Sequence, residues 1–154
     1  MPVLDLTDFP TTLPFGAPVA GLDLGEKTIG VAVSDATRSV ATPLETIRKA
    51  KFTDDVARLF ALMESRGAAG IVIGLPVNMD GTEGPRCQSV RAFARNLLRL
   101  KELPIAFWDE RLSTVAAQRM LTAEADLTRA RRADLVDKTA AAWILQGALD
   151  RLRG

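Results

Sequence analysis

Three acidic residues occupy positions where a carboxylate is costly. Asp23 interrupts the apolar stretch Val19–Leu24, and Glu110 follows Asp109 at the end of a second apolar stretch, Ile105–Trp108. Asp137 begins a helical stripe that is otherwise apolar and continues with Ala141, Ile144 and Ala148. A buried carboxylate has to be paired, hydrogen-bonded or bound to a cation. A cluster of acidic oxygen ligands without His or Cys suits Mg²⁺ or Mn²⁺. The pattern therefore favours convergence of the three acids on a divalent metal.

Each acid also has an ordinary interpretation. Asp23 could cap the turn that follows it, and Asp137 could be a first-turn acid favoured by the helix dipole. Glu110 could pair with Arg111 or Arg119. Asp109, its neighbour in sequence, points to the opposite face if the strand continues, so only one of the two can face a given site.

The residue types that are missing exclude several kinds of catalysis. The chain has no histidine and one cysteine, Cys87. Ser-His-Asp triads, Cys-His pairs and His-ligated zinc are therefore excluded. A single cysteine forms no internal disulfide, which favours a cytoplasmic location. Cys87 itself is expected to be an ordinary helix residue, because no base lies near it in sequence.

Length and composition are those of one globular domain. The chain has 154 residues, 47% of them hydrophobic, and a net charge of +1. No apolar run approaches the ~20 residues of a membrane span, and residues 1–18 lack the pattern of a signal peptide. We expect residues 1–18 to be a flexible extension and residues 19–154 to form a single domain. A net charge of +1 creates no strong global field, so any binding of nucleic acid has to depend on local clusters of basic residues.

The elements needed to position the acids follow from the hydrophobic pattern. It predicts three strands, then helix, strand, helix, strand and two helices. A β-meander followed by βαβ-type crossovers implies a mixed sheet flanked by helices. The expected elements are strands 19–24, 29–34, 40–47, 70–75 and 104–108, helices 53–65, 86–100, 114–121 and 134–153, and a mobile basic loop over 122–132.

Five segments in this order carry a resemblance to a known family. They are Gly21-Leu-Asp-Leu-Gly25, Ile29-Gly-Val-Ala-Val33, Ile73-Gly-Leu-Pro-Val-Asn-Met-Asp-Gly-Thr82, Asp109-Glu-Arg-Leu-Ser-Thr114 and Val136-Asp-Lys-Thr-Ala-Ala141. The chain resembles the YqgF family of RNase H-like, Holliday-junction-resolvase-like nucleases from about Val19 to Leu152. Asp-x-Gly alone is a weak signal, because sugar kinases share it, whereas the third and fourth segments are far more specific.

The resemblance implies an RNase H-like fold, a five-stranded mixed sheet with an antiparallel meander and parallel strands. It implies metal-dependent hydrolysis of phosphodiesters, with Asp23, Glu110 and Asp137 as catalytic residues and ligands of Mg²⁺ or Mn²⁺, two ions in all. It also implies 5′-end processing of the 16S ribosomal RNA precursor. RNase H-like nucleases often carry a fourth acid or a His on the last helix. Here Asp134 is the only nearby acid, and whether Asp134 or Asp109 joins the site is left open.

Six residues are candidates for substrate binding, each with an ordinary alternative. Lys27 and Thr28 could touch a phosphate or simply form an exposed turn. Asn78 could orient water or phosphate, although Asn-x-Asp-Gly also makes a turn. Arg111 could neutralise charge on the phosphate or form a salt bridge to Asp109.

Arg131 and Arg132 belong to the basic run Arg129–Arg132 that precedes Asp137. We expect this run to contact nucleic acid from a loop, and the alternative is a solvated loop.

Two other functions compete with an RNA nuclease. One is a junction-resolving DNA endonuclease, for which a homodimer would be required because a four-way junction needs two symmetric active sites. The other is a non-catalytic RNA-binding or transcription-associated factor on the same fold. A kinase half-domain is disfavoured because such kinases need two lobes. Monomer and homodimer both remain open.

Overall fold

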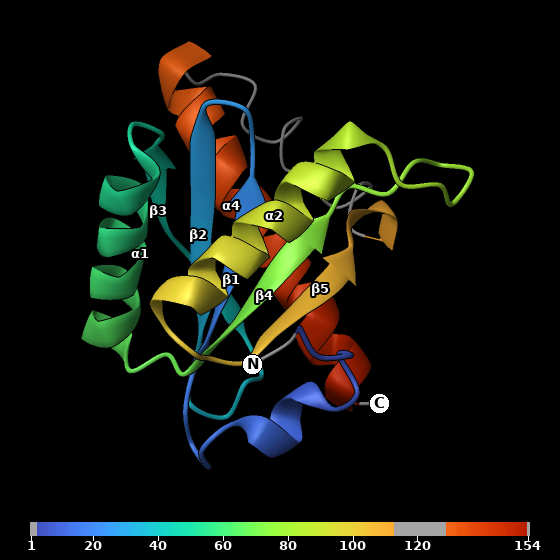
Figure 1. Cartoon of the computed structure of the whole chain (residues 1–154). Coiled ribbons are helices and arrows are strands. Elements are labelled where there is room, and N and C mark those ends of the chain that lie inside the picture. The colour runs from blue at the N-terminus through green and yellow to red at the C-terminus, as the bar shows by residue number, and fades with distance from the viewer. Residues whose placement is uncertain (1–2, 113–128, 154) are drawn as a thin grey trace.

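The computed structural model describes residues 3–112 and the backbone of residues 129–153, with side chains from residue 138 to residue 152 in the second range. One five-stranded sheet lies between helices (Figure 1). In chain order the elements are η1 (Phe9–Thr12), β1 (Val19–Leu24), β2 (Thr28–Ser34), β3 (Ala41–Arg48), α1 (Phe52–Arg66), β4 (Gly70–Leu75), α2 (Pro85–Leu100), β5 (Ile105–Asp109), η2 (Glu110–Leu112) and α4 (Arg129–Arg153).

The sheet is mixed, as the sequence predicts. Its strand order is β3-β2-β1-β4-β5. The first three strands pair antiparallel as a meander, and β4 and β5 extend the sheet in parallel from β1. β3 is an edge strand, in keeping with Pro43, which has no N–H to donate to a second neighbour. The strand β1, which carries Asp23, therefore lies at the centre of the sheet between β2 and β4.

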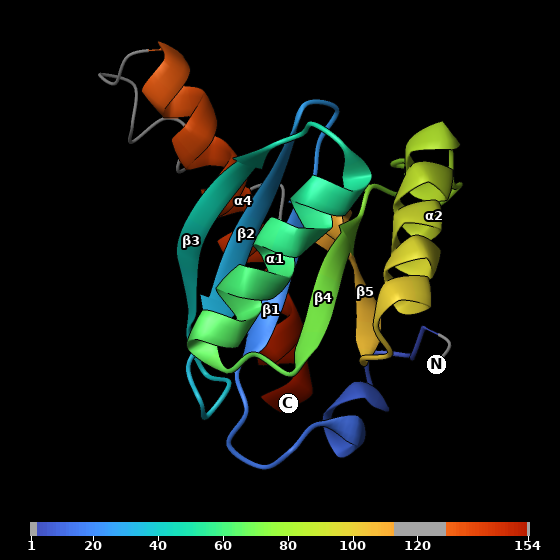
Figure 2. The same ribbon diagram turned by 60° about the vertical axis from the view of Figure 1, so that its left-hand side comes forward.

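Helices cover both faces of the sheet and divide the core in two. α1 and α2 lie on one face and α4 on the other, as Figures 1 and 2 show from two directions. Alternate residues of β1 serve the two cores. Ala20, Leu22 and Leu24 belong to the core under α1 and α2, and Val19 belongs to the core under α4. Because side chains alternate along a strand, Asp23 points to the α4 face.

The helix α4 packs very closely on the central strands. A methyl group on Gly21 of β1 would lie 2.6 Å from Cβ of Leu145. On the helix, Gly147 makes room for the ring of Trp108, whose atoms would lie 2.9 Å from such a methyl group. Gly21 lets α4 approach the strand that carries Asp23, and Gly147 lets α4 approach Trp108, which lies farther along the sheet.

The interpretation of residues 1–18 as a flexible extension is wrong for the part that packs on the domain. Phe9 is buried, and the backbone N–H of Leu4 donates to the carbonyl of Ile105 at 2.8 Å. The side chains of Phe9 and Leu13 lie against Gly70 at the start of β4. The aromatic and apolar residues of this segment gain more from burial than from exposure, so they anchor it.

The start of the last helix also differs from expectation. α4 begins at Arg129, so Arg129–Arg132 lie in a helix and not in a loop. Arg and Ala are good helix formers, and this run contains only those two residue types. The predicted helix 114–121 and the rest of the predicted loop, up to residue 128, lie outside the described residues. In the part that is described, no helix has the length and apolarity needed to cross a membrane.

Candidate active site

Asp23 and Glu110 come together on the α4 face of the sheet. Asp23 lies near the carboxyl end of β1, opposite Gly30 of β2. Glu110 starts the short helix η2 directly after β5, and its side chain lies over Gly74 of β4. The two carboxyl groups are joined by a side-chain hydrogen bond. Such a bond needs one proton, so a protonated Glu110 donates to the Asp23 carboxylate.

The electrostatics of the pair explain which group keeps the proton. Burial raises the pKa of Glu110 to about 7, and the charge of Asp23 and the hydrogen bond between the two side chains act in the same direction. The positive charge of Arg86 opposes this shift. A carboxyl group that holds its proton to neutral pH beside a second carboxylate is a common feature of functional sites.

The pair fits a divalent cation. Both groups offer hard oxygen ligands, and Glu110 holds its proton because burial and the charge of Asp23 raise its pKa. A cation would displace that proton, because a ligating carboxylate must be ionised. Mg²⁺ or Mn²⁺ suits this donor set better than a metal that prefers nitrogen or sulfur.

Asp137 lies on the helix that covers this face. The helix α4 includes its backbone, one turn before Ala141. Ala141, Ile144 and Ala148 are buried, as the predicted stripe requires. The carbonyl of Ala141 would lie 3.0 Å from a methyl group on Gly21, two residues before Asp23. The Asp137 side chain lies outside the described residues, and among those that are described no group of three or more His, Cys, Asp or Glu side chains forms. Convergence of all three acids therefore stays a prediction.

Asp109 and Arg111 pair with each other. The Arg111 guanidinium donates to the Asp109 carboxylate, with Nη2 and Oδ2 2.6 Å apart. This contact lowers the pKa of Asp109. The ordinary interpretation of Arg111 is thus what the structure shows. Arg111 also donates to the carbonyl oxygens of Asn78 and Met79, at 3.5 and 3.4 Å, so it connects η2 with the loop after β4.

The loop that contains Asn78 is a closed turn. The Asn78 side-chain amide donates to the hydroxyl of Thr82 at 3.1 Å, and the Thr82 hydroxyl donates to the Asp80 carboxylate at 2.6 Å. Gly81 has a φ of 89°, which favours glycine. The turn interpretation is confirmed, and Asn78 remains exposed beside it.

Lys27 and Thr28 lie at the tip of the β1–β2 hairpin, a few residues from Asp23. The N–H of Gly25 donates to the carbonyl of Thr28 at 2.9 Å, and the N–H of Lys49 donates to the carbonyl of Lys27 at 2.8 Å. The Lys27 side chain is exposed. These contacts fit a turn and leave the substrate-binding role as a prediction.

For Arg131 and Arg132 the structure gives the backbone alone. Both lie in the first turns of α4, close in sequence to Asp137, and Asp134 lies between them and that acid. Their side chains are outside the described residues, so their predicted contact with nucleic acid stays a prediction.

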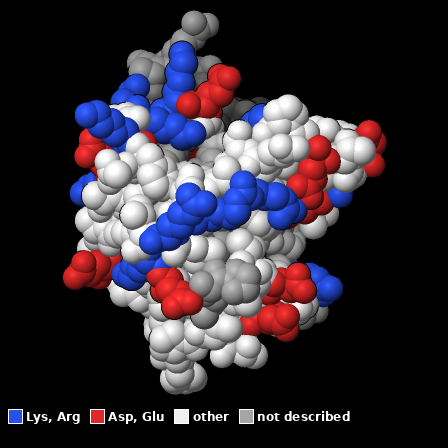
Figure 3. Space-filling view, viewed as in Figure 1, with Lys and Arg blue, Asp and Glu red and all other residues white. Residues whose placement is uncertain are grey.

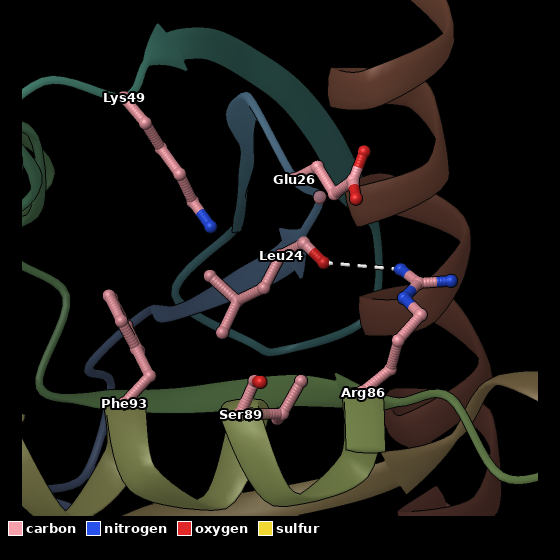
Figure 4. Close-up of a pocket in the computed structure, with 8 residues that line it drawn as sticks. Leu24, Glu26, Lys49, Arg86, Ser89 and Phe93 are labelled. Carbon is pink, nitrogen blue, oxygen red and sulfur yellow. Dashed lines mark hydrogen bonds between the residues drawn. The ribbon is translucent and has the colours of Figure 1, made fainter. Parts of the chain in front are cut away.

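The sequence interpretation missed two cations at the end of β1, Arg86 and Lys49. A pocket of about 190 Å³ at the end of β1 is lined by both, and Arg86 donates to the carbonyl of Leu24 at 3.4 Å (Figure 4). Arg86 stands in the first turn of α2, where the helix dipole disfavours a positive charge. That unfavourable placement was a signal available in the sequence.

The outer face of α2 is basic as well. Arg91, Arg95 and Arg99 are spaced four residues apart, so they share one side of the helix. Figure 3 shows a band of Lys and Arg along this helix. Arg91 is paired with Glu83, at 2.7 Å between Nε and Oε1. The single cysteine, Cys87, lies in the same helix, as expected. It is buried, and burial raises the pKa of its thiol.

Solved structures of low sequence identity share this fold. T. thermophilus RuvC in complex with a Holliday junction substrate matches with a TM-score of 0.52 and 16% identity over 88% of this chain and 96% of that chain. The fowlpox virus resolvase in complex with Holliday junction DNA matches with a TM-score of 0.55 and 8% identity, over 89% and 99%. These likenesses define the class of the fold as RNase H-like.

Sequence comparison narrows the class to one family. Residues 17–151 match the model of the RuvX family, described as Holliday junction resolvase. A protein of Phenylobacterium zucineum (strain HLK1) is 77% identical over 154 residues, 99% of each chain, and one of Caulobacter vibrioides (strain NA1000 / CB15N) is 68% identical over 155 residues, 100% of this chain and 99% of that one. Both bear the name "Putative pre-16S rRNA nuclease". The chain belongs to the RuvX family, which is the YqgF family that the motifs indicate.

Proposed function

We propose that this protein is a metal-dependent nuclease that hydrolyses phosphodiester bonds in 5′-end processing of precursor 16S ribosomal RNA. The observation that carries the proposal is the Asp23–Glu110 pair, two carboxyl groups held together on the α4 face of the central strands. Membership of a nuclease family and the names of the two relatives support the choice of reaction and substrate.

Asp23, Glu110 and Asp137 would hold Mg²⁺ or Mn²⁺, with two ions expected. Such ions, when bound, hold the attacking water, the scissile phosphate and the leaving oxygen, and they lower the pKa of the water. Asp23 is placed on the central strand, which keeps its carboxylate fixed. Glu110 has to release its proton before it can act as a ligand.

The role proposed for each candidate substrate-binding residue depends on the contacts that its side chain makes within the protein. Lys27, with its exposed side chain, and Thr28 would approach a backbone phosphate from the hairpin tip. Arg131 and Arg132 would do so from the start of α4. Asn78 and Arg111 would act mainly by shaping the loop and the turn that carry the site, because both make contacts within the protein. We place the activity in the cytoplasm.

A junction-resolving DNA endonuclease is the second candidate. The description of the family as Holliday junction resolvase favours it. This function would require a homodimer, because two strands of a junction have to be cut symmetrically. A monomer would suit a single RNA strand.

Cleavage of a set of labelled substrates tests the proposal. The set comprises precursor 16S fragments, unrelated single-stranded and duplex RNA, and four-way DNA junctions, each with Mg²⁺, Mn²⁺ or EDTA. We expect metal-dependent cutting of the precursor fragments in preference to the others. Preferential cutting of junctions by a dimer would support the second candidate. Binding without cutting under every condition would indicate a non-catalytic RNA-binding factor.

A further inference from the structure

The pocket at the end of β1 is formed by three separate segments. The β1–β2 hairpin contributes Leu24 and Glu26, the chain after β3 contributes Lys49, and one face of α2 contributes Arg86, Ser89, Val90 and Phe93. Its volume of about 190 Å³ is smaller than that of a typical cofactor site. It would therefore hold a small part of a larger ligand.

The two cations of this pocket have no acidic partner in the ion pairs formed by the described residues. Arg58 pairs with Glu45, Arg91 with Glu83 and Arg111 with Asp109, and none of these pairs includes Lys49 or Arg86.

Figure 4 shows the side chain of Lys49 extending toward Leu24 from one side, while Arg86 reaches the carbonyl of Leu24 from the other. Glu26 also lines the pocket, and its carboxylate turns away from Lys49 (Figure 4). Lys49 and Arg86 thus present positive charge that an anion could neutralise.

Between the cations the wall is apolar. Leu24, Val90 and Phe93 form it, and Phe93 is only partly buried. Its ring meets Phe52 edge-on, with centroids 5.6 Å apart and planes at 83°. Phe52 is half-buried as well, and its contact with Phe93 limits how the Phe93 ring can turn. An aromatic ring beside cations combines the two features that bind single-stranded nucleic acid: stacking for a base and charge for a phosphate.

The pocket lies at the end of the strand that carries Asp23. Leu24, which lines the pocket, directly follows Asp23 in β1, and the Arg86 guanidinium donates to the carbonyl of Leu24 at 3.4 Å. We propose that this pocket binds the nucleotide next to the scissile phosphate, with its base against Phe93 and its phosphate between Lys49 and Arg86. This inference rests on the proposed function and adds a substrate subsite on the α2 side of the hairpin.

RNA binding by the cleavage-deficient Asp23→Asn protein tests the subsite. Anisotropy of a labelled single-stranded precursor fragment is measured with Mg²⁺ over a range of salt concentrations. Lys49→Ala and Arg86→Ala should each weaken binding several-fold and reduce the slope of log affinity against log salt by about 1. Lys51→Ala and Arg99→Ala are matched controls, because these exposed cations lie two residues from Lys49 and at the far end of α2 and do not line the pocket.

The base is tested separately with Phe93→Leu and with RNA that carries a single abasic position, moved along the strand. Phe93→Leu should weaken binding of intact RNA about tenfold. It should have little effect on RNA whose abasic position falls at the pocket. A thermal melt of each variant distinguishes lost contact from lost folding, and the surface variants Lys49→Ala and Arg86→Ala decide the matter if Phe93→Leu does not fold.

The outcomes separate the two proposals. If Lys49→Ala and Arg86→Ala bind RNA like their controls, with an unchanged salt slope, the subsite is refuted while the nuclease proposal stands. If the parent protein cuts no RNA and the Asp23→Asn protein binds none, the proposed function fails and the subsite fails with it.

Discussion

The carboxyl group of Glu110 lies against Gly74, where a methyl group would come within 2.7 Å of Glu110 Oε1 and 2.5 Å of Ile144 Cδ1. Gly74 therefore leaves the space that Glu110 occupies between β4 and α4. The position of one acid of the site depends on a residue with no side chain in the neighbouring strand.

Gly74→Ala should disturb the site without changing its chemistry. The added methyl group would displace Glu110 or Ile144, so we expect a loss of about 1–3 kcal/mol of stability and a larger fractional loss of cleavage. Gly84→Ala is a suitable control, since a methyl group there meets Asn78 at an ordinary 3.5 Å. Urea denaturation and initial cleavage rates measure the two effects. Equal activity of Gly74→Ala and the parent protein would show that Glu110 is not held by this contact.

Asp137→Asn should reduce cleavage more than about a hundredfold, because loss of a direct ligand should exceed the usual effect of losing its supporting partners. Asp134→Asn is the matched control, one turn earlier on α4, and should stay within a few-fold of the parent. Titration with Mn²⁺ followed by calorimetry gives the metal affinity of each variant. If Asp134→Asn reduces cleavage more than Asp137→Asn does, the metal ligand on α4 is Asp134 and the assignment of Asp137 is wrong.

The raised pKa of Glu110 predicts an unusual pH dependence for the metal-free protein. Below pH 4.5 Glu110 is protonated in the folded and the unfolded chain. Between pH 4.5 and about 7 the unfolded chain loses this proton while the folded chain keeps it, so this group makes stability fall as pH rises. Above about pH 7 both forms are ionised and the decline ends.

Urea midpoints in EDTA measure this slope, which Glu110→Gln should abolish. Glu45→Gln provides a control of opposite sign. Its hydrogen bond with Arg58 lowers the pKa of Glu45, so that contribution is present above about pH 4.5 and is lost as pH falls. A slope between pH 4.5 and 7 that persists in Glu110→Gln would assign it to another group.

Arg111→Ala distinguishes a structural cation from one that contacts substrate. The pair with Asp109 is partly exposed, so its loss should cost less than about 1 kcal/mol of stability. If Arg111 mainly fixes the loop after β4, Arg111→Ala should leave the slope of log RNA affinity against log salt concentration unchanged. Arg111→Lys should behave like Arg111→Ala, because a lysine cannot form the two-pronged contact that Arg111 makes with Asp109. A salt slope lowered by about 1 would instead indicate a phosphate contact.

Much of the fold follows from local patterns in the sequence. β1 and β4 have the predicted bounds, because the apolar runs that form them are unambiguous. α2 begins one residue earlier than predicted, directly after the loop that follows β4. The start of α4 was misjudged because the run of arginines was interpreted by its charge, although its residues favour a helix. The N-terminal segment was misjudged because the partner of Phe9 is Gly70, distant in sequence.

The sequence allowed the acids of the candidate site to be predicted, but not the contacts that surround them. Asp23 and Glu110 were predicted because a carboxylate in or beside an apolar strand is energetically unfavourable, and the structure brings this pair together. Arg86 and Lys49 were missed because the chain brings them to the end of β1 only when α2 and the segment after β3 fold against it. Burial by tertiary packing also decides which of the two carboxyl groups keeps its proton.

The most direct test of the account is single-turnover cleavage of a labelled precursor 16S fragment by the parent protein and by Asp23→Asn, each with Mn²⁺ and with EDTA. We predict cutting by the parent with Mn²⁺ alone, and none by Asp23→Asn under either condition while its melting temperature in EDTA stays close to that of the parent. Cleavage by Asp23→Asn at the rate of the parent, or undiminished cleavage in EDTA, would contradict the assignment of Asp23 as a catalytic metal ligand.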